Sequence, residues 1–200
     1  MKSLQKKYGI FGGAFNPPHI AHSIIAKDIL ERLKLDKIIF IPSGNPPLKH
    51  RDVISAEHRY NMAKLAFGRD KDFLLSNIEA KNPDVKSYTV DTLLNLKKIY
   101  KNKKIKLYLI IGMDNLINFS RWHQPEKLFS LAEIVVLNRP GYPVDKLKPE
   151  FLQNVILIGN PLLEISSSML REYMRKGKSI KYFVNPDVEK YIIRNKLYLK

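Results

Sequence analysis

Short apolar runs rich in β-branched residues alternate with stretches of helical periodicity along most of the chain. The apolar runs lie at residues 8–11, 37–42, 73–76, 105–111, 133–138 and 155–158. The helical stretches lie at residues 20–33, 53–67, 90–100, 125–131, 168–176 and 187–196. Strands of this fully apolar kind, separated by helices, are typical of βαβ units and of a parallel sheet covered on both faces. The alternation predicts an α/β fold, a Rossmann-like doubly wound parallel sheet with helices on both faces.

The length and the cysteine count limit the organisation of the chain. Its 200 residues are typical of one domain, and we expect that domain to span residues 1–200, with a C-terminal helical segment at about 166–200 packed on it. The absence of cysteine excludes disulfides, thiolate metal sites and a cysteine nucleophile. The apolar runs are far shorter than the roughly 18 residues of a membrane span. We therefore expect a cytoplasmic protein without a membrane segment.

Basic residues exceed acidic ones by a wide margin. The chain has 35 Lys and Arg against 19 Asp and Glu, a formal net charge of +16. Such an excess favours anionic partners such as nucleotides, nucleic acid or acidic surfaces. The basic residues are spread along the chain rather than gathered in one tail, which is also typical of a solvated surface. Charge alone therefore does not choose among these partners.

The segment after the first predicted strand combines two glycines with two histidines ahead of a predicted helix. Parallel α/β sheets bind ligands at the carboxyl ends of their strands. Gly12 and Gly13 allow the backbone to approach a phosphate, and the helix that follows presents N–H groups and a positive dipole end. His19 and His22 share one face of the first helical turn, where imidazoles can donate hydrogen bonds to phosphate oxygens. We expect a phosphate-binding site here, although a tight turn alone would also explain the glycines.

A second cluster of phosphate-binding groups lies near the C-terminus. Residues 165–171 read Ile-Ser-Ser-Ser-Met-Leu-Arg and open a predicted helix. Serine hydroxyls at this position can cap the helix. Ser166, Ser167 and Ser168, followed by Arg171 one turn later, can also hold a phosphate through hydroxyls and a forked guanidinium. The pattern predicts a second phosphate cradle that faces the first.

Both segments resemble known signatures. The string Gly-Gly-x-Phe-x-Pro-x-His-x-x-His at residues 12–22 is similar to that of the nucleotidyltransferase superfamily marked by His-x-Gly-His. Ala21 stands where that superfamily usually has Gly, and Asn16 where Asp is common. Residues 165–171 resemble the Ile-Ser-Ser-Thr-x-x-Arg element of the small adenylyltransferases, with Ser168 in place of Thr.

The segments between these signatures narrow the resemblance. They are Pro-Ser-Gly-Asn-Pro-Pro-Leu-Lys at 42–49, Ser-Tyr-Thr-Val-Asp-Thr at 87–92, Gly-Met-Asp-Asn at 112–115, Arg-Trp-His at 121–123 and Asn-Arg-Pro-Gly at 138–141. Each follows a predicted strand or opens a helix, so all are expected at one cleft. Together they resemble the bacterial nicotinate-nucleotide adenylyltransferases over essentially the whole chain. Departures are Leu48 where the family often has His, and His123 where Tyr often follows Trp.

The resemblance implies that ATP and nicotinate mononucleotide react to give nicotinate adenine dinucleotide and pyrophosphate, with Mg²⁺ on the phosphates. It implies a catalytic role for His19, His22 and Arg171. The ATP-binding residues would be Gly12, Gly13, Phe15, His19, His22, Gly112, Asp114, Ser166, Ser167, Ser168 and Arg171. The mononucleotide-binding residues would be Asn45, Lys49, Tyr88, Thr89, Trp122, His123 and Arg139. Helix capping by Asp114, and scaffold packing of Tyr88 and Trp122, stay open as alternatives.

Two other functions remain possible from the sequence. A phosphopantetheine adenylyltransferase belongs to the same superfamily, but those chains are usually shorter and lack the Ser-Tyr-Thr and Arg-Trp-His segments. A basic nucleic-acid-binding module would explain the charge, but no recognised signature or basic stripe interleaved with aromatic residues supports it. We therefore expect small-molecule partners, no nucleic acid and no membrane, and the sequence does not indicate an oligomeric state.

Overall fold

The computed structural model describes residues 5–47, 53–138, 153–159, 161 and 163–199. Within them, the strands form one sheet in the order β3-β2-β1-β4-β5-β6, and each neighbouring pair is parallel. The strands are β1 Lys6–Gly13, β2 Lys37–Pro42, β3 Phe73–Leu75, β4 Ile105–Gly112, β5 Glu133–Asn138 and β6 Val155–Gly159. This order confirms the predicted doubly wound sheet.

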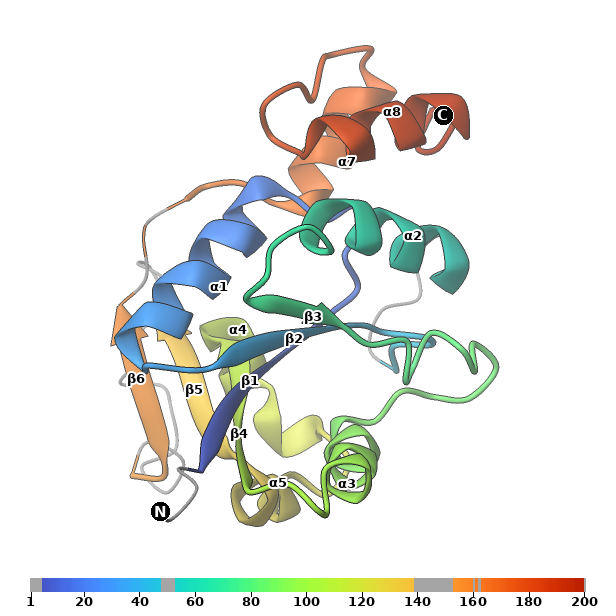
Figure 1. Ribbon diagram of the computed structural model, residues 1–200. Coiled ribbons are helices and arrows are strands. Elements are labelled where there is room, and N and C mark those ends of the chain that lie inside the picture. Colours follow the sequence, from blue (N-terminus) through green and yellow to red (C-terminus); the bar gives the residue numbers. More distant parts are fainter. Residues whose placement is uncertain (1–4, 48–52, 139–152, 160, 162, 200) are drawn as a thin grey trace.

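The helices cover both faces of the sheet. They are α1 Ile20–Arg32, α2 Ala56–Phe67, α3 Thr89–Ile99, α4 Met113–Ile117, α5 Pro125–Leu131, α7 Ser167–Arg175 and α8 Pro186–Arg194, with a short 3-10 helix at Phe119–Arg121. Figure 1 shows α1 and α2 on one face, and α3 and α5 on the other. The sheet is consequently buried on both sides, which is why its strands are apolar without alternation.

Successive residues of each strand supply the two cores in turn. In one core, Ile10 and Leu109 pack with Leu93 of α3. In the other, Phe40 and Ile110 pack with α1 and α2. Because side chains alternate between the faces of a strand, β1, β2 and β4 each contribute to both cores. This double burial fixes the strand register and the positions of the loops at the carboxyl ends of the strands.

The C-terminal helices form a separate layer beyond α2 (Figure 1). Leu170 of α7 and Val188 of α8 are fully buried against Met62 of α2 in a third apolar cluster. Ser166 caps α7 by accepting a hydrogen bond from the Met169 N–H, and Asn185 caps α8 in the same way from the Asp187 N–H. The predicted C-terminal helical segment therefore packs on α2 and leads the chain back to the first loop.

Two details differ from the sequence prediction. The second helix begins at Ala56 rather than at residue 53, because Ser55 accepts a hydrogen bond from the His58 N–H and so caps it. The short helix α4 and the 3-10 turn that follows were not predicted.

No described helix is long and apolar enough to cross a membrane.

Phe40 provides a test of the core on the α1–α2 side. Its ring is fully buried and stacks on Phe67, with ring centroids 3.7 Å apart. Because Phe40→Ala would leave a cavity among aromatic neighbours, we expect it to lower the free energy of unfolding by about 3–5 kcal/mol. Urea denaturation followed by circular dichroism measures this change. Ile193→Ala, at a side chain 66% exposed, should change it by less than about 0.5 kcal/mol.

Candidate active site

A cavity of about 260 Å³ opens at the carboxyl ends of β1 and β4, where the order of the strands reverses. This is the position at which open parallel sheets bind their ligands. Gly12, Gly13 and Gly112 form part of its lining, together with residues from the loops after β2 and β3 and from the start of α3. Residues of four segments that the sequence placed at one cleft (42–49, 87–92, 112–115 and 121–123) therefore meet at one cavity, whereas residues 139–141 lie outside the described residues.

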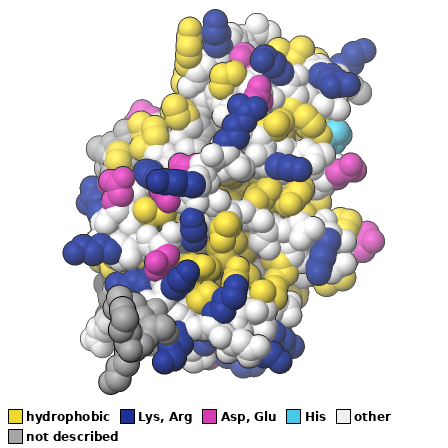
Figure 2. Space-filling model, viewed as in Figure 1, with side chains coloured by type: hydrophobic (Ala, Val, Ile, Leu, Met, Phe, Trp, Pro, Cys, Tyr) yellow, Lys and Arg dark blue, Asp and Glu magenta, His cyan; other side chains and the backbone are white. Residues whose placement is uncertain are grey.

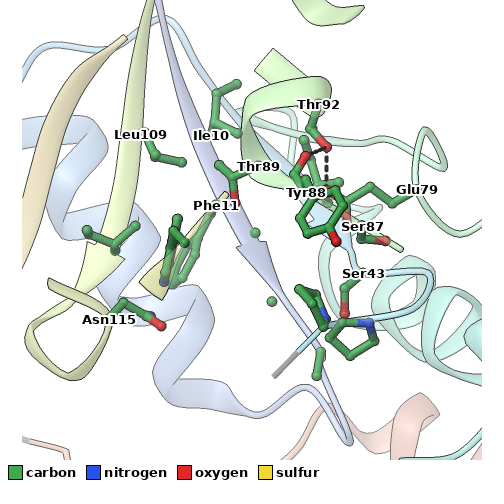
Figure 3. Close-up of a pocket in the computed structure, with 18 of the residues that line it drawn as sticks. Ile10, Phe11, Ser43, Glu79, Ser87, Tyr88, Thr89, Thr92, Leu109 and Asn115 are labelled. Carbon is green, nitrogen blue, oxygen red and sulfur yellow. Dashed lines mark hydrogen bonds between the residues drawn. The ribbon is translucent and has the colours of Figure 1, made fainter. Parts of the chain in front are cut away.

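The cavity has an apolar wall and a polar wall. Figure 3 shows Ile10, Phe11 and Leu109 of the central strands on one side. The other side carries the polar groups Ser43, Glu79, Ser87, Tyr88 and Thr92. An apolar pocket with a few convergent polar groups suits an aromatic ligand that bears a polar substituent.

Tyr88, Thr89, Trp122 and His123 all line this cavity. The rings of Tyr88 and His123 lie 4.5 Å apart between centroids, and Trp122 packs at 5.3 Å against the buried ring of Phe119. Thr89 is the first residue of α3, so the N-terminal N–H groups of that helix lie at the cavity wall. The structure thus brings together four of the residues predicted to bind the mononucleotide.

The two histidines lie against one another at the start of α1. Their rings are stacked, with centroids 3.7 Å apart. His22 Nδ1 accepts a hydrogen bond from the His19 backbone N–H at 3.1 Å. Because an accepting Nδ1 carries no proton, the neutral His22 ring has its proton on Nε2. His22 is therefore held in the tautomer that can donate from Nε2 to an oxygen.

The C-terminal signature closes onto the first loop. Ser167 Oγ donates to the Pro17 carbonyl at 2.8 Å, and Arg171 Nη1 donates to the Asn16 carbonyl at 2.9 Å. Arg171 Nη2 lies 3.3 Å from Ser168 Oγ. These bonds join segments 150 or more residues apart in the sequence and place the start of α7 beside the loop that leads to His19.

Asn16 and Phe15 serve the scaffold of this loop through their side chains. Asn16 is buried, and its Oδ1 accepts a hydrogen bond from the Tyr198 hydroxyl at 2.7 Å. Burial raises the pKa of Tyr198, which keeps its hydroxyl a donor. Phe15 is 3% exposed and packs at 5.4 Å against Phe67. The Phe15 ring is therefore enclosed in the core.

The loop after β4 and the start of α1 differ in detail from the sequence prediction. Asp114 is exposed in the first turn of α4, and it is the next residue, Asn115, that lines the cavity. The Ile20 N–H at the start of α1 is bound to the Phe183 carbonyl at 2.9 Å. One of the helix N–H groups expected to meet phosphate is therefore already engaged by the C-terminal region.

One described residue that was predicted to bind the mononucleotide, Asn45, is not part of the cavity lining. Asn45 pairs through its backbone with Ser87, donating to Ser87 Oγ at 3.1 Å and accepting from the Ser87 N–H at 2.9 Å. Its neighbours Pro46 and Pro47 line the cavity instead. Lys49 and Arg139 lie outside the described residues.

Arg59 supports two loops at the cavity, a structural role that the sequence prediction missed. Its side chain is 1% exposed and donates to the carbonyls of Ile54, Ala14 and Gly44, at 3.0, 3.1 and 2.7 Å. It also lies 3.3 Å from Ser43 Oγ. One guanidinium in α2 thereby holds the loops that follow β1 and β2. Its helical spacing with the buried residues Ala56, Ala63 and Phe67 was the available signal.

Glu79 is the second missed residue. It lines the cavity, and its Oε1 accepts a hydrogen bond from Thr92 Oγ1 at 2.7 Å. Burial raises the pKa of Glu79, while hydrogen bonds from Thr92 and Ser87 and the charge of Arg59 act in the opposite direction. Burial lowers the pKa of Arg59. A buried cation and a half-buried carboxylate thus face the same group of loops.

The donors near the first loop suit phosphate rather than a metal ion bound directly by protein. Among the described residues, no group of three or more His, Asp or Glu side chains is placed to hold a metal ion. Imidazole, hydroxyl and guanidinium donors match phosphate oxygens.

Comparison with known proteins identifies relatives over the whole chain. The cytidylyltransferase-like family model matches residues 10–173. The "Probable nicotinate-nucleotide adenylyltransferase" of Clostridium tetani is 40% identical over 201 residues, covering 96% of this chain and 99% of that protein. A protein of the same name from Caldicellulosiruptor saccharolyticus is 38% identical and covers 96% of this chain and 98% of its own length.

Solved structures support the fold. The Plasmodium falciparum nicotinic acid mononucleotide adenylyltransferase complexed with NaAD matches with a TM-score of 0.79 at 24% identity. The match covers 96% of this chain and 97% of that one. The structure of the same protein complexed with APC matches with a TM-score of 0.76 at 23% identity, with the same coverage.

Arg59 offers a test of how the site is held together. Arg59→Met would leave buried carbonyls without donors, each costing about 1–3 kcal/mol, so we expect the free energy of unfolding to fall by at least about 3 kcal/mol. Urea denaturation measures the loss. As a matched control, Arg32→Met removes an exposed arginine that pairs with Asp28 on α1 and should cost at most about 0.5 kcal/mol. Equal effects of the two variants would contradict the bracing role of Arg59.

Proposed function

The chain belongs to the cytidylyltransferase-like family and to its nicotinate-nucleotide adenylyltransferases, and from this premise we propose how its residues share that reaction. The enzyme transfers the adenylyl group of ATP to nicotinate mononucleotide, giving nicotinate adenine dinucleotide and pyrophosphate. The observation that carries this conclusion is identity of 40% over 96% of the chain with a relative of that name. The closure of the C-terminal signature onto the first loop supports the division of roles that follows.

The reaction needs positioning and charge neutralisation more than proton transfer. An oxygen of the mononucleotide phosphate attacks the α-phosphorus of ATP, and the bond from that phosphorus to the β-phosphate oxygen breaks. The attacking oxygen is already largely ionised near neutral pH, because the second pKa of a phosphate monoester is about 6. The electron pair of the broken bond leaves with pyrophosphate. Catalysis therefore rests on in-line alignment and on donors aimed at the phosphate oxygens.

His19, His22 and Arg171 form the phosphate half of the proposed site. The neutral His22 ring has its proton on Nε2, because its Nδ1 accepts from the His19 N–H, and Nε2 would donate to a phosphate oxygen. Arg171 would bind the departing pyrophosphate with a fork of N–H donors, assisted by Ser167 and Ser168. Its position one turn into α7, bonded to the Asn16 carbonyl, supports this role. Mg²⁺ would arrive as part of Mg·ATP and neutralise charge on the phosphates.

The cavity forms the pyridine half of the proposed site. The apolar wall and the rings of Tyr88, Trp122 and His123 suit a planar heteroaromatic ring. Thr89 and the N-terminal N–H groups of α3 suit the nicotinate carboxylate, because a helix N-terminus favours an anion. Lys49 and Arg139 stay predicted ligands of the mononucleotide phosphate.

The dispersal of basic residues over the surface favours small-molecule substrates over a nucleic-acid partner. Figure 2 shows Lys and Arg side chains spread over the visible face rather than gathered into one stripe. This dispersed pattern supports a solvated surface, as does the range of exposed lysine positions along the chain. We infer that the substrates are ATP and a pyridine mononucleotide, and that the enzyme acts in the cytoplasm.

Pyrophosphate release tests the proposed function directly. We expect the purified protein to release pyrophosphate only when ATP, Mg²⁺ and a pyridine mononucleotide are all present, because the mononucleotide supplies the attacking oxygen. A coupled phosphate assay measures the rate, with phosphopantetheine as the comparison substrate. Comparison of the rates with nicotinamide mononucleotide and nicotinate mononucleotide measures the preference for a carboxylate over a carboxamide on the pyridine ring. Absence of release with either pyridine nucleotide would refute the assignment.

His22 allows its structural and chemical roles to be separated. His22→Asn keeps an acceptor near the Nδ1 position but removes the Nε2 donor, so we expect turnover to fall by roughly 10²-fold with little change in thermal stability. His22→Gln places an amide N–H near the Nε2 position and should retain more activity than the Asn variant. Steady-state kinetics and thermal melting measure both effects. An unchanged turnover in His22→Asn would remove this imidazole from the mechanism.

A further inference from the structure

Ser87 is held by three hydrogen bonds at the entrance to α3. Its Oγ accepts from the N–H groups of Gly44 and Asn45, both at 3.1 Å. A hydroxyl has two lone pairs and one proton, so both acceptor positions are taken and the proton is left to donate. That proton goes to the carboxylate of Glu79, whose pKa the hydrogen bond with Ser87 lowers.

Thr92 lies one turn into α3 and approaches the same carboxylate. Its Oγ1 is 2.7 Å from Glu79 Oε1 and 3.2 Å from the Tyr88 carbonyl. A threonine hydroxyl has a single proton, and the shorter distance assigns that proton to Glu79. The carboxylate thus accepts one hydrogen bond from the residue before Tyr88 and one from the third residue after Thr89.

The residues between these two anchors are Tyr88 and Thr89, which line the cavity. Figure 3 shows Glu79, Ser87, Tyr88, Thr89 and Thr92 gathered on the polar side of the pocket. We propose that Glu79 is a positioning residue for the pyridine mononucleotide: it fixes Ser87 and Thr92 and thereby sets the place of Tyr88 and of the first N–H groups of α3. This inference rests on the proposed function, which assigns the pyridine half to that segment.

The loops around Glu79 are packed too closely to replace this anchor by small shifts. A Cβ added to Gly44 would lie 2.3 Å from the Glu79 carbonyl oxygen, so the two backbones are in direct contact. Arg59 holds the Gly44 carbonyl at 2.7 Å from the other side. Because Gly44 is fixed on both sides, its N–H can donate to Ser87 from only one position. Loss of the carboxylate therefore acts on residues 87–92 rather than on the β2 loop.

The geometry also predicts which substitution is tolerated. In Glu79→Gln the amide oxygen can accept the Ser87 proton, and the amide N–H can donate to Thr92, whose own proton then turns to the Tyr88 carbonyl. Glu79→Met offers neither acceptor nor donor at similar length. The network is therefore expected to survive the first change and to fail in the second.

Steady-state kinetics with both substrates test the proposal. We expect Glu79→Met to raise the KM for nicotinate mononucleotide by about 10-fold or more, since an anchoring hydrogen-bond network is lost, and to change the KM for ATP by less than about 2-fold. Glu79→Gln should stay within about 3-fold of the natural enzyme for both substrates. Glu57→Met, at an exposed glutamate in the first turn of α2, is the control and should leave both values unchanged.

Two further measurements keep the outcome decisive. Trp122 is the single tryptophan and lines the cavity. Its fluorescence therefore follows binding of nicotinate mononucleotide without turnover, and Glu79→Met should weaken that binding.

Thr92→Val should raise the KM for nicotinate mononucleotide, with little additional effect in the Glu79→Met background, because the effects of neighbours in one network are not additive. Either an unchanged KM for nicotinate mononucleotide in Glu79→Met or equal increases in both KM values would overturn the inference. A natural enzyme inactive with nicotinate mononucleotide would instead overturn the proposed function, and this inference with it.

Discussion

Two hydrogen bonds between the start of α7 and the first loop hold the proposed site together. Ser167 and Arg171 donate to the carbonyls of Pro17 and Asn16, which lie two and three residues before His19. The sheet positions the loop from one side, and the C-terminal cluster on α2 positions α7 from the other. Without that closure, the histidines and Arg171 would belong to separate surfaces. The phosphate half of the site therefore depends on a contact between the two ends of the chain.

The sequence predicted the sheet and the location of the site because both follow from local patterns. A strand buried on both faces must be apolar throughout, and the carboxyl ends of parallel strands meet at one edge. The same logic did not find α4, since its 5 residues are too few to show a helical period. The ligand role that it assigned to Asp114 stays a prediction, and the structure places Asn115 at the cavity wall. A one-residue difference of this kind is set by helix phase, which tertiary packing decides.

Arg59 and Glu79 were missed for a different reason. A charged residue in a helix or loop normally faces water; helical spacing is a weak signal for the burial of Arg59, and no local motif marks Glu79. Their removal from water is acceptable because their polar groups are matched: Arg59 meets backbone carbonyls and Glu79 meets two hydroxyls. The carbonyls of Ala14 and Gly44 and the hydroxyls of Ser87 and Thr92 come from other segments than the charges that they meet. Only the folded arrangement reveals that the charges have partners, and hence that they organise the loops.

The distribution of charge in the site fixes the direction in which a mononucleotide can bind. The region around His19, His22 and Arg171 is the proposed phosphate half, while the half-buried carboxylate of Glu79 lies at the start of α3 in the proposed pyridine half. A carboxylate beside the triphosphate would oppose the binding of that anion. The Glu79 carboxylate instead accepts hydrogen bonds from the Ser87 and Thr92 hydroxyls, and the positive charge of the nearby Arg59 offsets its negative charge. On the proposed division of roles, we therefore expect the pyridine ring to enter the cavity first, with the mononucleotide phosphate directed toward the ATP phosphates, as in-line attack requires.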